Sequence, residues 1–175
     1  MTPAEKQREF MERLDPVYRR LERFALSMTK DREAARDLVH DTILAAYLNY
    51  EKIQNKNAFI GYLFTIASNE FKRSYRRRKI FGFYDEETAQ EIPTPDAQPD
   101  VATDVTLMRE AMLKLPDTMR EAIALFEFSG LSLQDIQKIQ GTSLSNVKAR
   151  VARGRRRLAK LLGINNDTSE PDSIE

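Results

Sequence analysis

Residues 131–162 constrain the fold of this chain most, because they predict a short helix, a tight turn and a long helix with two chemically opposite faces. In the long helix, apolar or small residues recur at steps of three and four and so form one stripe. The stripe consists of Leu144, Val147, Val151, Gly154, Leu158 and Leu161. Cations, with no acid among them, occupy the flanks and the opposite side: Lys148, Arg150, Arg153, Arg155, Arg156, Arg157 and Lys160. A helix that packs by one stripe and presents cations on its free face suits contact with a polyanion.

The residues around the turn predict a helix-turn-helix. Ser132 and Asp135 have the spacing of a capping box at the start of the first helix. Gly141 can adopt the positive φ that ends this helix, and Ser143 suits the N-cap of the next one. In such a motif the second helix enters the DNA major groove. The alternative is a solvated basic face on an ordinary amphipathic helix, which the caps and their spacing disfavour.

The exposed side of the long helix supplies the candidate contacts to duplex DNA. Arg153 and Lys148 can reach phosphates or guanine edges, and the small side chains of Ala149 and Ala152 permit close approach and contact with thymine methyl groups. The full candidate set is Ser145, Asn146, Lys148, Ala149, Arg150, Ala152 and Arg153.

Charge is segregated along the chain, although the formal net charge is only +1. Residues 72–79 (KRSYRRRK) hold six cations and no acid. Residues 84–108 hold seven acids, three prolines and no Lys or Arg, a composition that predicts a flexible acidic linker. We therefore predict an all-α protein with two small helical domains: a helical domain at 1–84, a linker at 85–103, a second helical domain at 104–163 and a polar acidic tail at 164–175.

Composition excludes several classes of protein. The 41% apolar content of the 175 residues supports packed cores, and the absence of Cys excludes disulfides and thiolate metal sites. No stretch resembles a signal peptide or approaches the roughly 20 apolar residues of a membrane span. We expect a cytoplasmic protein without a cofactor, a bound metal or membrane insertion.

The first domain is predicted to contain three helices. Phe10, Leu14, Val17 and Leu21 keep helical spacing in the first, and Asp15-Pro16 is expected to restart it. Asp31 is a candidate N-cap for the second helix. The second helix is expected to bury Ala35, Leu38, Val39, Thr42, Ile43 and Ala46.

The third helix, expected at about residues 57–79, begins apolar and ends strongly basic, with aromatic rings set among the cations. This mixture suits single-stranded nucleic acid, because cations hold phosphates and rings stack on unpaired bases. The candidate residues are Asn69, Lys72, Arg73, Tyr75 and Arg76. The alternative is that Phe71 and Tyr75, at positions i and i+4, belong to the core.

Three segments in this order resemble the extracytoplasmic-function (ECF) sigma factors of bacterial RNA polymerase: DREAARDLVHDTILAAY (31–47), AFIGYLFTIASNEFKRSYRRRK (58–79) and the segment at 111–162 that ends in the helix-turn-helix. The resemblance implies two helical domains, sigma domain two and sigma domain four. It implies that the basic third helix melts and reads the −10 element and that the last helix reads the −35 element. It also implies that Asp37, His40 and Asp41 face the clamp helices of core RNA polymerase. Promoter DNA and core polymerase are thus the expected partners, with an anti-sigma factor as a further one.

The chain departs from the family pattern at three positions. Asn146 stands where the family commonly has Thr, Gln137 where a small residue is expected, and Gly154 where Ala is usual. A glycine costs about 1 kcal/mol in a helix interior.

No catalytic signature is present: the sequence has one His and no Gly-rich phosphate loop, and acid pairs such as Glu86-Glu87 lie in the expected linker. Three hypotheses remain. They are a polymerase-binding promoter-recognition subunit, a DNA-binding regulator that uses the helix-turn-helix without polymerase, and a nucleic-acid-remodelling enzyme. The first accounts for both basic regions and the helix at 31–47. The second leaves the N-terminal half without a role, and the third lacks catalytic residues.

Overall fold

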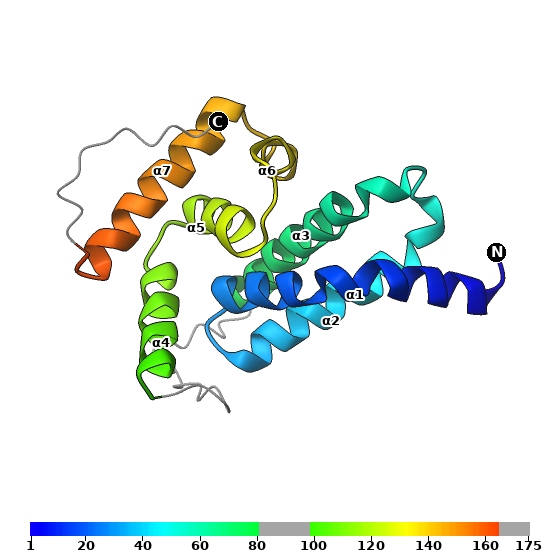
Figure 1. Cartoon of the computed structure of the whole chain (residues 1–175), viewed down its shortest axis with the longest axis horizontal. Helices are drawn as coiled ribbons and strands as arrows, with labels where there is room; N and C mark the ends of the chain where they lie inside the picture. The colour runs from blue at the N-terminus through cyan, green and yellow to red at the C-terminus, as the bar shows by residue number, and fades with distance from the viewer. Residues whose placement is uncertain (81–98, 165–175) are drawn as a thin grey trace.

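The computed structural model describes residues 1–80 and 99–164, with the side chains of 99–102 left out. Every regular element within these ranges is helical, which confirms the all-α prediction (Figure 1). The N-terminal domain holds α1 (Pro3–Met28), α2 (Arg32–Leu48), the short turns η1 (Tyr50–Lys52) and η2 (Lys56–Ala58), and α3 (Phe59–Ile80). The C-terminal domain holds α4 (Pro99–Leu113), α5 (Asp117–Ile123), the π-helical turn η3 (Ala124–Phe128), α6 (Leu133–Gln140) and α7 (Leu144–Leu161). Most of the expected linker and nearly all of the expected tail lie outside the described residues.

Helix α1 is continuous, so the predicted restart at Asp15-Pro16 is wrong. Pro16 lies inside the helix, where proline removes one backbone hydrogen bond at a cost of about 3 kcal/mol. The apolar stripe continues on both sides of Pro16, and its burial outweighs that cost, since each large apolar side chain contributes about 1.5–3 kcal/mol. The buried residues of the stripe include Phe10, Leu14, Val17, Leu21 and Phe24.

The core of the N-terminal domain is built from edge-to-face aromatic contacts. The ring of Phe10 lies 5.4 Å from that of Tyr50 and 5.7 Å from that of Phe59, and Phe24 lies 5.8 Å from Phe64. Such pairs add about 0.5–1.5 kcal/mol beyond the burial of their area. These contacts join α1 to η1 and α3 and so fix the direction of α3.

Helix α2 begins as the sequence predicts, because the Asp31 carboxylate accepts a 2.7 Å hydrogen bond from the Ala34 amide. Of its expected buried residues all are buried except Ile43, which is half-buried. Thr42 is buried within the helix because its hydroxyl donates to the Leu38 carbonyl at 2.7 Å. Helix α3 starts at Phe59, directly after η2, and so two residues later than expected.

Helix α4 begins at Pro99, inside the segment expected to be linker. Proline is well tolerated at the first position of a helix, where its missing amide hydrogen has no partner to lose. The residues that follow it, up to Leu113, are all helical despite their acidic composition. The start of the second helical domain, predicted at residue 104 from the composition of the linker, is therefore five residues too late in the chain.

Gly154 lies at a close contact between α7 and α5. It is buried, and a Cβ placed on it would lie 2.6 Å from Cγ1 of Ile123 and 3.1 Å from Cγ of Met119. The glycine therefore sets the spacing between α7 and α5. This close contact explains why a residue of low helix propensity occupies the position.

We expect Gly154→Ala to destabilise the C-terminal domain by about 1–3 kcal/mol, because the added methyl group overpacks the contact with Ile123. Gly61→Ala is the matched control, since Gly61 is also helical and a Cβ there would meet nothing within 4 Å. That variant should gain about 0.4–1 kcal/mol. Urea unfolding followed by circular dichroism measures both, and equal stabilisation by the two alanines would contradict the packing role of Gly154.

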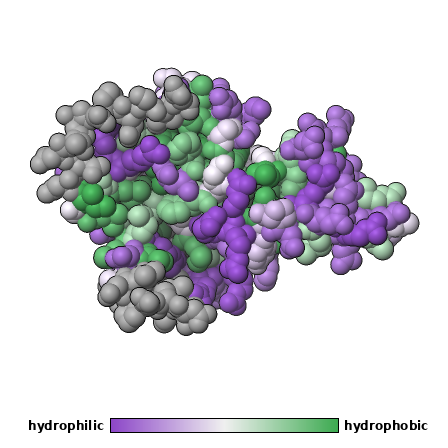
Figure 2. Space-filling model, in the orientation of Figure 1, coloured by the Kyte–Doolittle hydropathy of each residue, from purple (hydrophilic) through white to green (hydrophobic). Residues whose placement is uncertain are grey.

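The two domains are in contact along α1. Residues of η3 and α4 lie beside the C-terminal half of α1, and α6 lies beside α3 (Figure 1). The buried apolar side chains of both domains form one continuous cluster. Figure 2 shows apolar side chains reaching the surface in the half that holds α4–α7, whereas hydrophilic side chains dominate the end that holds the N-terminus.

Among the described residues, no helix combines the length and the apolar character that crossing a lipid bilayer requires.

Candidate nucleic-acid interfaces

The turn between α6 and α7 has the geometry that the sequence predicts. Gly141 ends α6 in the left-handed conformation, with φ 60° and ψ 40°. The Ser143 hydroxyl caps α7 by accepting from the Asn146 amide at 3.1 Å. Ser132 caps α6 in the same way, accepting from the Asp135 amide at 3.1 Å, while its own hydroxyl donates to the Asp135 carboxylate at 2.8 Å. These caps fix the angle at which α7 leaves the turn.

Helix α7 packs by the predicted stripe and leaves its opposite side open. Val147, Val151, Gly154 and Leu158 are buried, and Leu144 is half-buried. Leu161 is 44% exposed, so its predicted place in the packed stripe is wrong; it falls in the last turn of the helix, beyond the buried stripe. The candidate DNA contacts divide into two groups. Ser145, Asn146 and Arg153 are exposed, whereas Lys148, Ala149, Arg150 and Ala152 are half-buried on the flanks.

Two cations of α7 are engaged within the protein. Nη1 of Arg150 donates to Oε1 of Gln140 on α6 at 2.8 Å. Nε of Arg155 lies 2.5 Å from a carboxylate oxygen of Glu127, and its guanidinium lies 5.3 Å from the ring centroid of Phe126. Arg155 therefore joins α7 to η3, on the side away from Arg153. The run of cations in the sequence is thus not a single DNA-facing set.

The basic end of α3 is partly exposed and partly covered. Asn69, Arg73 and Arg76 are exposed, and Arg73 pairs with Glu70 at 2.8 Å. The ammonium of Lys72 lies 3.4 Å from the carboxylate of Glu121, which belongs to α5 in the other domain.

The aromatic pair on α3 lies at the junction of the two domains. The rings of Phe71 and Tyr75 stack with centroids 6.2 Å apart and an interplanar angle of 28°. The guanidinium of Arg120 lies 5.9 Å from the ring centroid of Phe71. Both rings are half-buried and Phe71 packs against the buried core, so neither ring is a fully open stacking platform.

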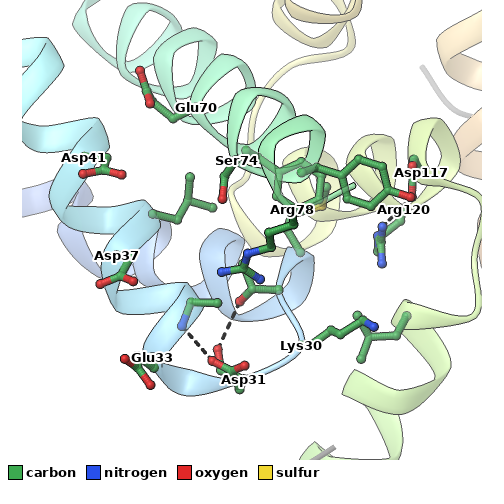
Figure 3. Close-up of a pocket in the computed structure, with 17 residues that line it drawn as sticks. Lys30, Asp31, Glu33, Asp37, Asp41, Glu70, Ser74, Arg78, Asp117 and Arg120 are labelled. Atoms are coloured by element: carbon green, nitrogen blue, oxygen red, sulfur yellow. Dashed lines mark hydrogen bonds and ion pairs between the residues drawn. The ribbon is translucent and has the colours of Figure 1, made fainter. Parts of the chain in front are cut away.

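The candidate polymerase-binding residues of α2 are exposed but do not form one group. Asp37 and Asp41 line a cleft of about 700 Å³ between α2, the end of α3 and α5 (Figure 3). His40 lies on another side of α2, in a groove that it shares with Arg19 and Arg36. The structure thus brings the two acids together, one helical turn apart, and separates His40 from them.

The residues that join the domains, above all Glu121, were not predicted from the sequence. This carboxylate is only 3% exposed, accepts a short hydrogen bond from the Ser68 hydroxyl, and accepts another from Nε2 of Gln140 at 2.9 Å. The sequence does hold a signal for buried charges here, because Arg120 and Glu121 interrupt an otherwise apolar run at 119–125. Charged residues are almost never fully buried unless they are paired.

Comparison with known proteins matches both domains to one family. Residues 14–80 match the family model of sigma-70 region 2, and residues 106–158 match that of sigma-70 region 4. The ECF RNA polymerase sigma factor EcfG of Rhodopseudomonas palustris is 33% identical over 144 residues, which cover 81% of this chain and 78% of that protein. This chain belongs to the ECF sigma factors. SigM of Bacillus subtilis, another ECF sigma factor, is 30% identical over 83% of this chain and 91% of its own length.

Two solved structures share the fold of this chain. The sigma factor RpoE of Bartonella quintana, in complex with the anti-sigma factor NepR, superimposes with a TM-score of 0.77 at 30% identity, covering 90% of this chain and 98% of that one. CnrH in complex with the cytosolic domain of CnrY has a TM-score of 0.67 at 24% identity, covering 91% and 90%, which shows likeness of fold. As an ECF sigma factor, the chain binds core RNA polymerase and directs it to −10 and −35 promoter elements for transcription initiation.

Proposed function

We propose that this sigma factor divides its work among three helices: α7 reads the −35 element, α3 opens and reads the −10 element, and α2 binds the polymerase clamp. One observation carries the proposal. Ser145, Asn146 and Arg153 are exposed on the side of α7 opposite its buried stripe, and α7 is the second helix of a capped helix-turn-helix. In this motif that side of the second helix enters the major groove.

The α7 surface combines long polar side chains that can contact bases with small side chains that let the helix lie close to the DNA. Arg153 can make a bidentate contact with a guanine edge or hold a phosphate, and Asn146 can contact an adenine edge. Ala149 and Ala152 leave room for the groove floor and can touch thymine methyl groups, while Lys148 and Arg150 flank the surface as phosphate contacts. Nη1 of Arg150 already donates to Gln140, so a phosphate would be contacted by the other N–H groups of its guanidinium.

The α3 surface suits an unpaired strand. Asn69, Arg73 and Arg76 are exposed, and Lys72 and Tyr75 lie beside them on the same helix. Cations that follow a phosphate backbone, together with rings on which bases stack, stabilise single strands without catalysing any reaction. The protein therefore supplies binding energy for strand separation and leaves the chemistry to polymerase, so we assign it no enzymatic activity of its own.

We expect Asn69→Ala and Tyr75→Ala to impair open-complex formation more than polymerase binding. Losing one base-stacking ring costs about 1–3 kcal/mol. Permanganate footprinting of promoter thymines measures opening, and a pull-down with core polymerase measures assembly. Gln7→Ala, which removes an exposed amide on α1, is the control. Wild-type opening rates in the Asn69→Ala/Tyr75→Ala double variant would reject the α3 assignment.

The α2 surface offers an acidic contact. Asp37 and Asp41 are exposed and one turn apart, so they can face a basic partner surface together. His40 points into a separate groove and would contribute at the edge of the contact.

Two further roles follow from the family. The structure of RpoE with the anti-sigma factor NepR motivates the proposal that an anti-sigma factor binds this chain as well. Because core polymerase acts in the bacterial cytoplasm, we place the protein there. The alternative, a regulator that binds DNA without polymerase, is not favoured, because it assigns no role to the region 2 match at 14–80.

A further inference from the structure

The turn between α6 and α7 carries a side-chain hydrogen bond that is separate from the caps of both helices. Nδ2 of Asn146 donates to the Thr142 hydroxyl at 3.0 Å. Asn146 is the third residue of α7, and Thr142 directly follows Gly141, the residue that ends α6. In a helix-turn-helix, the N-terminal residues of the second helix contact base edges in the major groove. The hydrogen bond therefore lies where α7 would meet the DNA.

The backbone holds both partners of this hydrogen bond in place. The backbone amide of Thr142 donates to the Gln137 carbonyl at 3.4 Å, and Gly141 beside it adopts the left-handed conformation. The backbone amide of Asn146 donates to the Ser143 hydroxyl at 3.1 Å. The caps of α6 and α7 thus set the positions of Thr142 and Asn146 relative to each other.

The hydrogen bond acts on orientation more than on the stability of the fold. Asn146 is exposed and Thr142 is half-buried, so water can serve each partner when the bond is broken. An unrestrained asparagine amide turns about its last side-chain bond, which has roughly two preferred orientations. The bond to Thr142 favours the orientation in which Nδ2 faces the turn.

This orientation determines which base the amide can bind. An asparagine amide has two N–H donors on its nitrogen and an acceptor oxygen. With one N–H donated to Thr142, the second N–H and Oδ1 of Asn146 remain for a base edge. Adenine offers the matching pair in the major groove, an N6 donor and an N7 acceptor. Guanine offers two acceptors, N7 and O6, so Oδ1 would face an acceptor there and lose its hydrogen bond.

We propose that Thr142 is a positioning residue for −35 recognition: its hydroxyl orients the Asn146 amide for adenine, so that this chain selects an A·T base pair at the position that Asn146 meets. The inference rests on the proposed reading of the −35 element by α7. A threonine at position 146, as the family commonly has, carries no amide to orient, so the selection depends on the residue pair of this chain. Holding a side chain in its binding orientation saves the cost of immobilising it, which corresponds to about a two- to tenfold change in affinity.

Selection of promoter variants by the holoenzyme tests the proposal. The full chain is assembled with core polymerase and given duplexes that carry a promoter transcribed by this holoenzyme, with the −35 region randomised. Sequencing of the bound duplexes gives the ratio of adenine to guanine at each position. We expect one position at which the wild type prefers adenine by about fivefold to more than a hundredfold, and at which Asn146→Ala removes the preference.

Thr142→Val keeps the shape of the side chain but cannot accept a hydrogen bond. We expect it to lower the adenine-to-guanine ratio about two- to tenfold at that position alone, because the amide can then also present Nδ2 to guanine. Thr142→Ser retains the hydroxyl and should keep the wild-type ratio. Thr118→Val, which removes an exposed hydroxyl from α5, is the matched control. A loss of stability would weaken binding to all sequences alike, so a change confined to one base pair reports the orientation of the amide.

The outcomes separate the positioning role from the role of α7. In the Asn146→Ala background, Thr142→Val should have no further effect. An unchanged ratio in Thr142→Val, beside a lost preference in Asn146→Ala, would overturn the positioning role and leave the −35 role of α7 intact. A wild-type preference for guanine at this position would overturn the proposed orientation. Unchanged preferences in Asn146→Ala would also overturn the inference, and normal binding by Arg153→Ala in the same assay would extend the failure to the −35 role of α7. If Thr142→Val does not fold, Thr142→Ala decides in its place.

Discussion

Replacing Asp37 and Asp41 together by lysine is expected to weaken binding to core RNA polymerase by about 3 kcal/mol, roughly a hundredfold, because like charges brought together across an interface cost several kcal/mol. Both carboxylates are exposed on α2 and line the same side of it (Figure 3). Neither residue caps a helix, so the free energy of unfolding should change by no more than about 0.5 kcal/mol. Fluorescence polarisation of the labelled chain with core polymerase measures the affinity.

The control reverses the same number of acidic charges on a different helix. Glu12→Lys/Asp15→Lys reverses two exposed acids of α1, and this variant should bind polymerase within a fewfold of the wild type. Wild-type affinity in a well-folded Asp37→Lys/Asp41→Lys variant would show that this face of α2 is merely solvated.

Arg153→Ala is expected to weaken binding to a −35 duplex by about 1–3 kcal/mol, or about fivefold to more than a hundredfold. Arg153 is exposed on α7 opposite Val151 and Gly154, both buried, so its removal leaves the packing of the helix unchanged. A base contact and a phosphate contact differ in their signature. Loss of a base contact relaxes specificity at one position, whereas loss of a phosphate contact weakens all sequences and reduces the dependence of affinity on salt.

Arg19→Ala is the matched control for Arg153→Ala, because it removes another exposed arginine, on α1, together with an ion pair to Glu22 at 3.6 Å. Such pairs contribute about 0–1 kcal/mol to stability. Duplex affinity and salt dependence that match the wild type in Arg153→Ala would contradict the placement of α7 in the groove.

Local signals in the sequence predicted much of this fold correctly. Asp31, Ser132 and Ser143 act as N-caps, and Gly141 ends α6, because capping depends on residues a few positions apart. The stripe of α7 was also readable, since helical periodicity places Val147, Val151 and Leu158 on one side.

Features that depend on packing between distant segments could not be predicted in the same way. Pro16 carries a local signal for a helix boundary, but tertiary burial on both sides keeps α1 continuous. Gly154 has a low helix propensity, and only the position of Ile123 explains it. The domain junction depends on contacts between residues about 50–110 positions apart, such as Ser68 with Glu121 and Arg20 with Ser129. The sequence did place Lys72 and Tyr75 on a basic helix, yet it gave no indication that they lie at the domain junction.

If this chain directs polymerase to promoters through two separate DNA-reading helices, transcription from genomic DNA will reveal it. Core polymerase would transcribe fragmented genomic DNA of the source organism with and without the chain, and the 5′ ends of the transcripts would be mapped. We expect new start sites that share a −10 and a −35 motif at fixed spacing. The variants Asp37→Lys/Asp41→Lys and Arg153→Ala should each strongly reduce transcription from these sites. Start sites identical to those of core polymerase alone, despite binding of the chain to DNA, would rule out this role of the two helices.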